Sequence, residues 1–402
     1  MKKIKITLLI LFSFWCGYEG HKNDLFPLPH FIKRIATQVT AVPSSTHVTI
    51  TKINAITSPF PDEGYKVELP TNFIAEKRIR LNNFVVDWDF FNVPAIKKTG
   101  HALLEDGWLW FINQDDQNLL RKIGLESSIS HNGGIKAFFK LSGEFFFYVA
   151  YHKDGCSKVS IFKLKTKTKV LDLPCLPNSI SADLNGSGGT WEYISENEII
   201  FSIGTPSKNH TSDQINQLAQ NNESFYGKFL RLKIDAQGKL SSEIFSTGHR
   251  NPQGVISYDS KFYAVEHGPM GGDEVNILVA NQNYGWPLQS LGSEYDLKEI
   301  NKDFSKPLNV IKPLYSFTPS IGISSINKCP KSYEEYYSPN KCLSVGSMRG
   351  GSIFLLVHDD NRVFFHERLD FGSRIRKFFI RDDNIIAVTD FNGIVIGNLK
   401  KL

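Results

Sequence analysis

The chain has 402 residues and a formal net charge of +5, with 41% hydrophobic and 22% charged residues. This balance excludes a disordered chain and allows a large buried core. The positive surplus is small and the lysines are scattered, without a basic patch interleaved with aromatic residues, which excludes a typical nucleic-acid-binding protein. The 30 phenylalanines and 14 tyrosines, against 3 methionines, favour β-structure.

The N-terminus, MKKIKITLLILFSFWCGYEG (1–20), has a lysine-rich start followed by a short apolar run, 6–15. This pattern predicts a secretory signal that is too short to span a bilayer comfortably. Phe14 and Trp15 are bulky where a cleavage site favours small residues, so an uncleaved anchor stays open as an alternative, and Cys16 leaves a lipoprotein open. We expect an exported protein, periplasmic or extracellular, that meets a membrane only through this anchor or lipid.

Residues 21–80 are rich in proline and threonine, and we assign them to an N-terminal extension with one or two strands. From residue 81 on, short apolar runs alternate with Gly, Asn and Asp turns, for example EFFFYVAYH (144–152) and KFYAVEHG (261–268). Their length and their β-branched and aromatic content predict strands. The stretch SDQINQLAQNNESF (212–225) predicts a modest helical or loop insertion.

A repeated unit, a turn followed by an apolar and then a polar strand, recurs along the chain. Examples are LLEDGWLWFINQDDQNLLRKI (103–123), YISENEIIFSIG (193–204) and FIRDDNIIAVTDFNGIVIGNL (379–399). Units spaced by about 50 residues over roughly 320 residues are typical of about six propeller blades. We therefore predict an all-β fold, a six-bladed β-propeller over 81–402 that follows the extension, with an array of β-sandwiches as the alternative.

Four of the five cysteines lie outside the N-terminal signal: Cys156, Cys175, Cys329 and Cys342. An even number of locally paired cysteines in an exported chain favours two disulfides over a metal site. Four free thiols remain the alternative. No C-x-x-C motif is present, so the sequence does not indicate zinc.

Nucleotide-binding and hydrolase fingerprints such as G-x-G-x-x-G and G-x-S-x-G are absent. Instead, GHRNPQG (248–254), EHGPMGGDEVNIL (266–278) and NYGWP (283–287) follow one another closely. In this order and spacing they resemble the soluble PQQ-dependent glucose/sorbosone dehydrogenase family, and a weaker similarity extends over about residues 95–402. The resemblance implies a six-bladed propeller that binds pyrroloquinoline quinone (PQQ) and calcium at one end of its channel. It also implies an aldose sugar as substrate and a separate electron acceptor.

PQQ is a flat tricarboxylate ortho-quinone, and such a ligand needs several guanidinium groups because arginine pairs bidentately with carboxylates. The resemblance assigns contacts with this cofactor to Asn132, Arg250, Asn251, Ser320, Gly322, Arg349, Arg374 and Arg376. The alternative for 248–254 is a rigid turn, and for 373–378 a solvated outer strand. Alternation along a strand puts Arg374 and Arg376 on one face, where they repel each other unless an anion lies between them.

The quinone also needs a hard cation, because Ca²⁺ polarises a quinone oxygen and prefers oxygen ligands. The resemblance implies that the backbone carbonyls of Gly268 and Pro269 hold the PQQ-bound ion. It assigns Glu274 and the backbone of Tyr284 to a second, structural calcium. The alternatives are a surface charge for Glu274 and a core aromatic for Tyr284.

The sequence departs from the family at the expected catalytic base. The family has a histidine in the stretch that corresponds to DLNGSGGTWEYISENEIIFSIG (183–204), and here Asn185 or Gly186 takes its place. Neither residue can accept a proton. The candidates for a relocated base are His101, His131, His249 and His267, each with a purely structural role as the alternative. We expect PQQ binding with slow aldose oxidation; the rival hypothesis is a non-catalytic propeller that binds a carbohydrate or a protein.

Overall fold

The computed structural model describes residues 65–68, 77–81, 83–91, 100–105, 108–208, 211–300, 309–390 and 393–402. Contacts divide the chain into two units, Met1–Lys52 and Ile53–Leu402. The first unit, with the expected signal sequence and Cys16, lies outside the described residues. Within the described residues, none of the helices has both the length and the apolar character needed to cross a bilayer.

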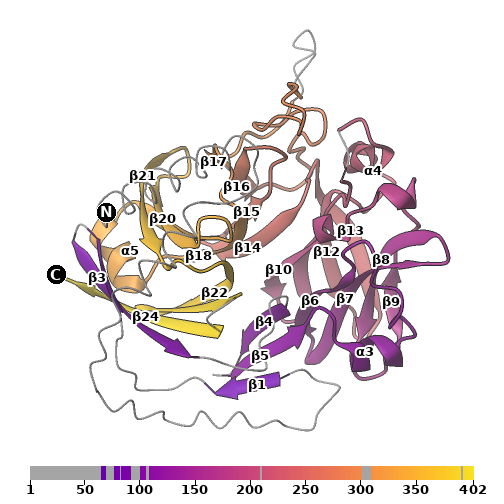
Figure 1. Ribbon diagram of the computed structural model, residues 1–402, viewed down its shortest axis with the longest axis horizontal. Helices are drawn as coiled ribbons and strands as arrows, with labels where there is room; N and C mark the ends of the chain where they lie inside the picture. Colours follow the sequence, from indigo (N-terminus) through magenta and orange to yellow (C-terminus); the bar gives the residue numbers. More distant parts are fainter. Residues whose placement is uncertain are drawn as a thin grey trace, which may run out of the picture. The chain divides into compact units, whose positions relative to one another are not determined.

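Antiparallel sheets make up the described part of the second unit (Figure 1). The first sheet has the order β1-β5-β4 and contains β1 (Tyr65–Glu68), β4 (Gly100–Glu105) and β5 (Trp108–Asn113). The second contains β6 (Gly134–Leu141), β7 (Glu144–Lys153), β8 (Cys156–Lys163) and β9 (Lys169–Asp172). The third contains β10 (Gly188–Ser195), β11 (Glu198–Ile203), β12 (Lys228–Ile234) and β13 (Leu240–Thr247).

The next two sheets repeat the four-stranded meander. The fourth contains β14 (Pro252–Tyr258), β15 (Lys261–Glu266), β16 (Asp273–Leu278) and β17 (Tyr315–Phe317). The fifth contains β18 (Ile323–Lys328), β19 (Lys341–Ser347), β20 (Ser352–His358) and β21 (Val363–Asp370). The sixth has the order β2-β3-β24-β23-β22 and contains β2 (Lys77–Arg80), β3 (Phe84–Phe91), β22 (Ile375–Arg381), β23 (Asn384–Thr389) and β24 (Gly393–Lys401). The sheets thus begin with β1 and β2, inside the segment that we assigned to the extension.

Short helices connect some of these strands. They are α3 (Gln117–Lys122), α4 (Gln214–Gln217) and α5 (Lys331–Tyr337), with single 3₁₀ turns η1 (Ser179–Ser181), η2 (Leu184–Gly186) and η3 (Leu218–Gln220). Asp116 caps α3 because its carboxylate accepts from the Leu119 amide at 3.0 Å. Helix α4 and turn η3 lie within 212–225, where the sequence predicts a modest helical insertion.

The sheets form a ring. The innermost strand of each sheet contacts the innermost strand of the next, in the order β4, β6, β10, β14, β18 and β22, and β22 contacts β4 again (Figure 1). Buried clusters fill the spaces between neighbouring sheets; one of them joins Phe139 and Tyr148 of the second sheet to Phe201 and Leu230 of the third. The prediction of a six-bladed β-propeller is confirmed.

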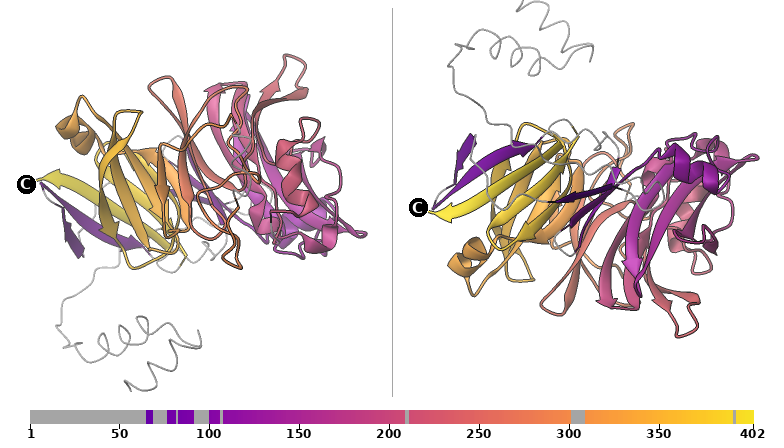
Figure 2. Two further views of the ribbon diagram at one scale, coloured as in Figure 1. Left: turned by 90° about the horizontal axis from the view of Figure 1, so that it is seen from above. Right: turned by 90° about the horizontal axis from the view of Figure 1, so that it is seen from below.

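The sixth blade joins both ends of the ring. Strand β24 pairs antiparallel with β3 from Ile394, opposite Phe91, to Lys401, opposite Phe84. The two strands lie side by side in both views of Figure 2. Strands from the two ends of the described chain therefore share one sheet.

A β-bulge recurs near the start of five of the inner strands. The pairing register shifts within β6, β10, β14, β18 and β22. In four of them this leaves one residue without an opposite partner, namely Lys136, Gln253, Ser324 and Arg376. Bulges redirect side chains and are frequent next to active sites.

Both expected disulfides are confirmed. Cys156, at the start of β8, is bonded to Cys175, with a Cα–Cα distance of 5.3 Å. Cys329, just before α5, is bonded to Cys342 in β19, with a Cα–Cα distance of 5.4 Å.

Candidate functional site

The residues that the sequence singles out lie at one end of the ring, in the loops that lead into the inner strands. Asn132 precedes β6, Asn185 precedes β10, Arg250 precedes β14, Gly322 precedes β18 and Arg374 precedes β22. We call this end the rim, and define it by these five residues together with Lys136, Asn251, Gly268, Ser320, Arg349 and Arg376. Hydrogen bonds and close packing connect the loops that form the rim.

The first part of the rim is the turn that contains His249. Gly248 has φ +76°, and a Cβ there would lie 2.1 Å from Asn283 Oδ1, so this turn requires glycine. His249 is completely buried. Its Nδ1 lies 3.0 Å from Glu266 Oε1, its Nε2 lies 2.9 Å from Ser246 Oγ, and its ring stacks on Tyr284. Both nitrogens are engaged away from solvent, which gives His249 the structural role rather than that of a relocated base.

Arg250 is fixed by its backbone as well as by its side chain. Its amide donates to Glu266 Oε2 at 2.9 Å, so a single carboxylate orients both His249 and Arg250. The guanidinium donates to the carbonyl of Gly268 at 2.8 Å and lies over the ring of Trp286 at 5.3 Å. This explains why GHRNPQG and EHGP occur together: Glu266, which the sequence analysis quoted but did not assign, connects them.

Asn251 connects the same two stretches. Its carbonyl accepts from the His267 amide at 3.1 Å. Its side-chain oxygen accepts from Gln253 Nε2, at the bulge of β14, at 2.8 Å. The Asn251 side chain is therefore held by a neighbour at the rim.

Asp273 fastens the turn 267–272 to the loop that contains Ser320 and Gly322. Its Oδ1 accepts from the Gly268 amide at 3.2 Å, and its Oδ2 accepts from the amides of Ile321 and Ile323 at 3.0 and 3.1 Å. Burial raises the pKa of Asp273, but the hydrogen bond and charge of His267, together with hydrogen bonds from Ile323 and Ser320, outweigh burial, and the pKa is lowered overall. An ionised Asp273 thus holds the loop, and His267 is tied to it at 3.7 Å.

The remaining arginines lie next to this loop. The carbonyl of Gly322 accepts from the Met348 amide at 2.8 Å, and Met348 Sδ lies 3.7 Å from Arg374 Nη2. Arg349 is exposed. Within the described residues, we find no side-chain partner for its guanidinium group.

Arg374 and Arg376 share one carboxylate. Arg374 Nε donates to Asp390 Oδ2 at 2.8 Å, and Arg376 Nη2 donates to both Asp390 oxygens at 3.1 and 3.2 Å. Asp390 therefore supplies the anion that lies between the two arginines. The alternative of a solvated outer strand is wrong, because Arg376 lies on β22, the innermost strand of its blade.

Lys136 is a rim residue that the sequence analysis missed. Its Nζ donates to the carbonyl of Asn132 at 2.7 Å and lies 3.5 Å from Asn185 Oδ1. Asn132, with φ +60°, donates its side-chain N–H to Asp183 Oδ1 at 3.0 Å. Lys136 is only 6% exposed. Burial lowers its pKa to about 7; the Asp183 carboxylate raises it and the Arg376 guanidinium lowers it further.

His101 and His131, two of the histidines considered as a relocated base, lie in different surroundings. His101 Nε2 lies 2.9 Å from the carbonyl of Ile135, and burial, followed by the charges of Lys136 and Arg376, lowers the pKa of His101 to about 3. His131 packs its ring against His152, with a centroid distance of 4.4 Å. His101 is therefore neutral over most of the pH range.

A small cavity of about 20 Å³ adjoins Arg250 and is lined by Glu266, Gly268, Pro269, Glu274 and Tyr284, among others. This volume is enough for about one water or one ion. Asn276 Nδ2 donates to both carboxylates, at 3.1 Å to Glu266 and 3.1 Å to Glu274. Burial, and then the charge of Glu266, raises the pKa of Glu274 well above its usual value. Glu274 is therefore no ordinary surface charge, and a cation beside it would favour its ionised form.

Tyr284 is a buried core aromatic, as its alternative assignment expects. Its hydroxyl donates to the carbonyl of Ile277 at 2.6 Å and accepts from the Val279 amide at 2.8 Å. Only its backbone is therefore available to an ion. No three His, Cys, Asp or Glu side chains group as metal ligands in the part of the chain that the structure describes, so carbonyls would supply the other ligands.

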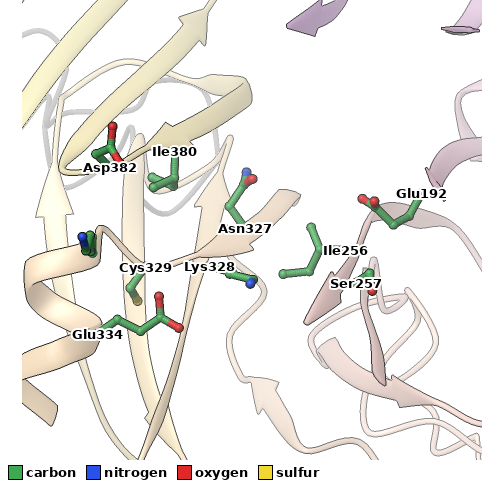
Figure 3. A pocket seen from close by; sticks show the side chains of 10 residues that line it. Glu192, Ile256, Ser257, Asn327, Lys328, Cys329, Glu334, Ile380 and Asp382 are labelled. Carbon is green, nitrogen blue, oxygen red and sulfur yellow. The ribbon is translucent and has the colours of Figure 1, made fainter. Parts of the chain in front are cut away.

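A larger cavity, of about 360 Å³, lies at the other ends of the inner strands. Figure 3 shows its side chains coming from four of these strands, with Glu192 from β10, Ile256 from β14, Asn327 from β18 and Ile380 from β22. Of the residues that the sequence singles out, the disulfide-bonded Cys329 lines this cavity, and none of the candidate cofactor, metal or base residues does. Two of its polar side chains have partners: Glu334 accepts from the Tyr258 hydroxyl, and Asn327 Nδ2 donates to the Phe378 carbonyl.

Several known proteins are similar to this chain in sequence or in fold. The model of the family "Glucose / Sorbosone dehydrogenase" matches residues 135–396. An uncharacterised protein of Synechocystis is 29% identical over 226 residues, which cover 52% of this chain and 53% of that protein. The aldose sugar dehydrogenase YliI of Escherichia coli is 25% identical over 258 residues, which cover 58% of this chain and 62% of that enzyme.

Solved structures extend the likeness in fold. The PQQ-bound form of an aldose sugar dehydrogenase from Streptomyces coelicolor superposes with a TM-score of 0.53 at 16% identity, and covers 78% of this chain and 98% of that one. At this identity the likeness concerns the fold alone. The matched part of this chain spans between about half and three fifths of the length of the two curated relatives.

Proposed function

Because this chain belongs to the glucose/sorbosone dehydrogenase family, we propose that it is an exported PQQ- and calcium-dependent dehydrogenase of aldose sugars. The observation that carries the proposal is the gathering of Arg250, Arg349, Arg374 and Arg376 at one rim with few acidic partners. The names of the E. coli and Streptomyces relatives point to the same substrate class and cofactor. When bound, PQQ supplies a two-electron oxidant that accepts hydride.

The donor set at the rim fits a tricarboxylate. Two guanidiniums share the single carboxylate of Asp390, which leaves one positive charge, and Arg349 adds another. Arginine also has five N–H donors, so those not used by Asp390 remain for a ligand. Each charge-assisted hydrogen bond contributes about 1.5–3 kcal/mol. Ser320, Gly322, Asn251 and Asn132 would complete the contacts from neighbouring loops.

The acidic pair beside Arg250 fits a hard cation. Glu274 and Glu266 lie on one small cavity together with Gly268 and Pro269, and burial, followed by the charge of Glu266, raises the pKa of Glu274. The Gly268 carbonyl already accepts from Arg250 and keeps a second lone pair for an ion. Calcium at this place would neutralise the pair and, near PQQ, polarise its quinone oxygen.

Two disulfides support export, because such bonds persist in oxidising compartments.

One observation favours the rival function, a non-catalytic propeller that binds a carbohydrate or a protein: Asn185 and Gly186 cannot serve as a base. Aldose oxidation would then be slow unless another group accepts the proton.

Binding of PQQ by the purified full-length protein is the test. We expect the quinone absorbance to change on titration with PQQ in the presence of Ca²⁺, and affinity to fall when the ion is chelated. Arg250→Ala removes one guanidinium and should weaken PQQ about 10- to 100-fold. Arg362→Ala, an exposed arginine in the β20–β21 turn, is the matched control and should bind as the wild type does. No PQQ binding by the wild type would leave the rival function.

A further inference from the structure

The nitrogen of Lys136 lies beside the residue where the sequence lacks a base. Asn185 occupies that place, and its Oδ1 is 3.5 Å from Lys136 Nζ. On the other side, Lys136 Nζ donates to the Asn132 carbonyl at 2.7 Å. The charged ammonium form of lysine has three N–H donors, whereas the neutral amine has a lone pair that can accept a proton. Lys136 is therefore a titratable group at the position where a proton acceptor is missing.

A β-bulge in β6 positions the Lys136 side chain. Lys136 is the extra residue of the bulge in β6, between Ile135, opposite Val149, and Ala137, opposite Tyr148. Both neighbours are buried in clusters between blades, Ile135 in one and Ala137 in another. Arg376 is the extra residue of the corresponding bulge in β22. A cationic side chain thus occupies the equivalent bulge in two blades, and only the lysine can lose its proton.

The charges around Lys136 favour a mixture of its two forms at neutral pH. Burial lowers its pKa to about 7, Asp183 from the turn before β10 raises it, and Arg376 from β22 lowers it. His101 on β4 also faces it, but with a pKa near 3 that ring is neutral. The neutral amine is therefore abundant near pH 7, where an ordinary lysine is almost fully protonated.

Several other titratable groups at or near the rim are already engaged by neighbouring residues. His249 is buried with both nitrogens engaged, and His267 is tied to Asp273. The Oδ1 of Asp183 accepts from Asn132 and from the Asn185 amide. Arginine does not lose its proton in proteins.

We propose that Lys136 is a catalytic residue that takes the proton of the sugar C1 hydroxyl, an inference that rests on the function proposed above. The hydroxyl O–H bond breaks and an N–H bond forms, which leaves Lys136 as an ammonium group. The electron pair of the C1–H bond departs as hydride to the ortho-quinone oxidant, and the C1–O bond becomes a carbonyl. The Asn132 carbonyl and the Asp183 carboxylate stabilise the ammonium product.

The protonation of Lys136 can be measured without cofactor or turnover. In protein labelled with ¹³C- and ¹⁵N-lysine, the side-chain resonance that disappears in Lys136→Met belongs to Lys136. We expect it to titrate with a midpoint near pH 7. The exposed Lys233 is the internal reference. A Lys136 resonance that titrates near the ordinary lysine value of about 10.4 would overturn the proposal.

Turnover is then measured at saturating PQQ, Ca²⁺ and glucose, so that binding and chemistry are separated. Lys136→Met should lose about 10²–10⁴-fold in the rate of quinone reduction and also the rise of that rate through pH 7. Lys136→Arg keeps the positive charge but cannot accept a proton, so it should lose as much. Lys140→Met, at the other end of the same strand, is the control and should keep the wild-type rate.

The outcomes distinguish the role of Lys136 from the proposed function of the protein. If PQQ binds and Lys136→Arg keeps a rate within tenfold of the wild type, the assignment of Lys136 is wrong while the proposed function stands. If the wild type binds no PQQ, the proposed function fails and the assignment falls with it. Normal PQQ binding together with loss of turnover in both Lys136 variants supports both.

Discussion

At the scale of single residues, the rim is organised by buried carboxylates that hold partners from other strands. Glu266 orients His249 and the Arg250 amide, Asp273 holds the loop before β18, and Asp390 pairs with two arginines. The motifs made the arginines predictable from the sequence. Their acidic partners were not, because an Asp or Glu at the end of a strand looks the same in the sequence whether it meets solvent or a residue from a distant segment.

His358 gives a prediction about pH at this scale. It is fully buried at the end of β20, where its Nδ1 accepts from the Asp360 amide at 3.1 Å. Burial lowers its pKa from 6.5 to about 4, against the opposing charge of Asp360. Between these values the unfolded chain binds a proton that the folded chain does not, so stability falls as the pH drops from 6.5 to 4. The loss is on the order of 3 kcal/mol.

His358→Asn keeps an acceptor for the Asp360 amide but does not titrate. We expect its unfolding free energy, measured by urea denaturation, to depend less on pH between 6.5 and 4 than that of the wild type. The control is His366→Asn, an exposed histidine on β21, which should leave the wild-type slope unchanged. Equal slopes for wild type and His358→Asn would contradict the assignment.

At the scale of elements, alternating apolar runs and turn residues predicted the strands, since each blade is a local meander whose strands are adjacent in sequence. The bulges were not predictable. The side chains at the bulges of β6, β14, β18 and β22 are Lys136, Gln253, Ser324 and Arg376, which share no residue type. A shift in register depends on the partner strand and on the neighbouring blade, and neither is visible in the strand itself.

The disulfide between Cys329 and Cys342 gives a prediction for one element. It closes a loop with a sequence separation of 13 around α5, and both cysteines are buried in the core between the fifth and sixth blades. Closing such a loop contributes about 3 kcal/mol in the chain-entropy model. We expect the Cys329→Ala/Cys342→Ala double variant to lose about that much in urea unfolding. Reductant should then lower the unfolding free energy of the variant less than that of the wild type. An equal decrease in both proteins would show that the Cys329–Cys342 disulfide contributes nothing to stability.

At the scale of the whole molecule, the rim exists only because the ring closes. Arg250 and Arg376 belong to different blades, and Lys136 meets Asn185 only where the second blade contacts the third. The family resemblance predicted that these residues converge, whereas periodicity alone predicted only about six similar units. Convergence depends on the order in which blades pack, a long-range property that no local pattern contains.

Strand β24 is therefore the element on which the site as a whole depends. It lies between β3 and β23, and it places Val395 and Leu399 in one buried cluster and Ile394 and Ile396 in another. Loss of each such side chain typically removes about 2–5 kcal/mol, and four together are comparable with the roughly 5–15 kcal/mol that stabilise a domain. Deletion of residues 393–402 should abolish cooperative unfolding and PQQ binding together. Circular dichroism measures the unfolding transition, and quinone absorbance measures PQQ binding.

Removal of the exposed Leu402 alone is the matched control and should affect neither measurement. A ligand that binds only the closed ring stabilises it in proportion to the logarithm of its concentration, so excess PQQ should raise the melting temperature of the control protein. The longer deletion lacks the pairing of β24 with β3, so PQQ should not restore its cooperative unfolding. A truncated chain that still melts cooperatively and binds PQQ would mean that the rim forms without ring closure, and the dependence of the site on β24 would then be wrong.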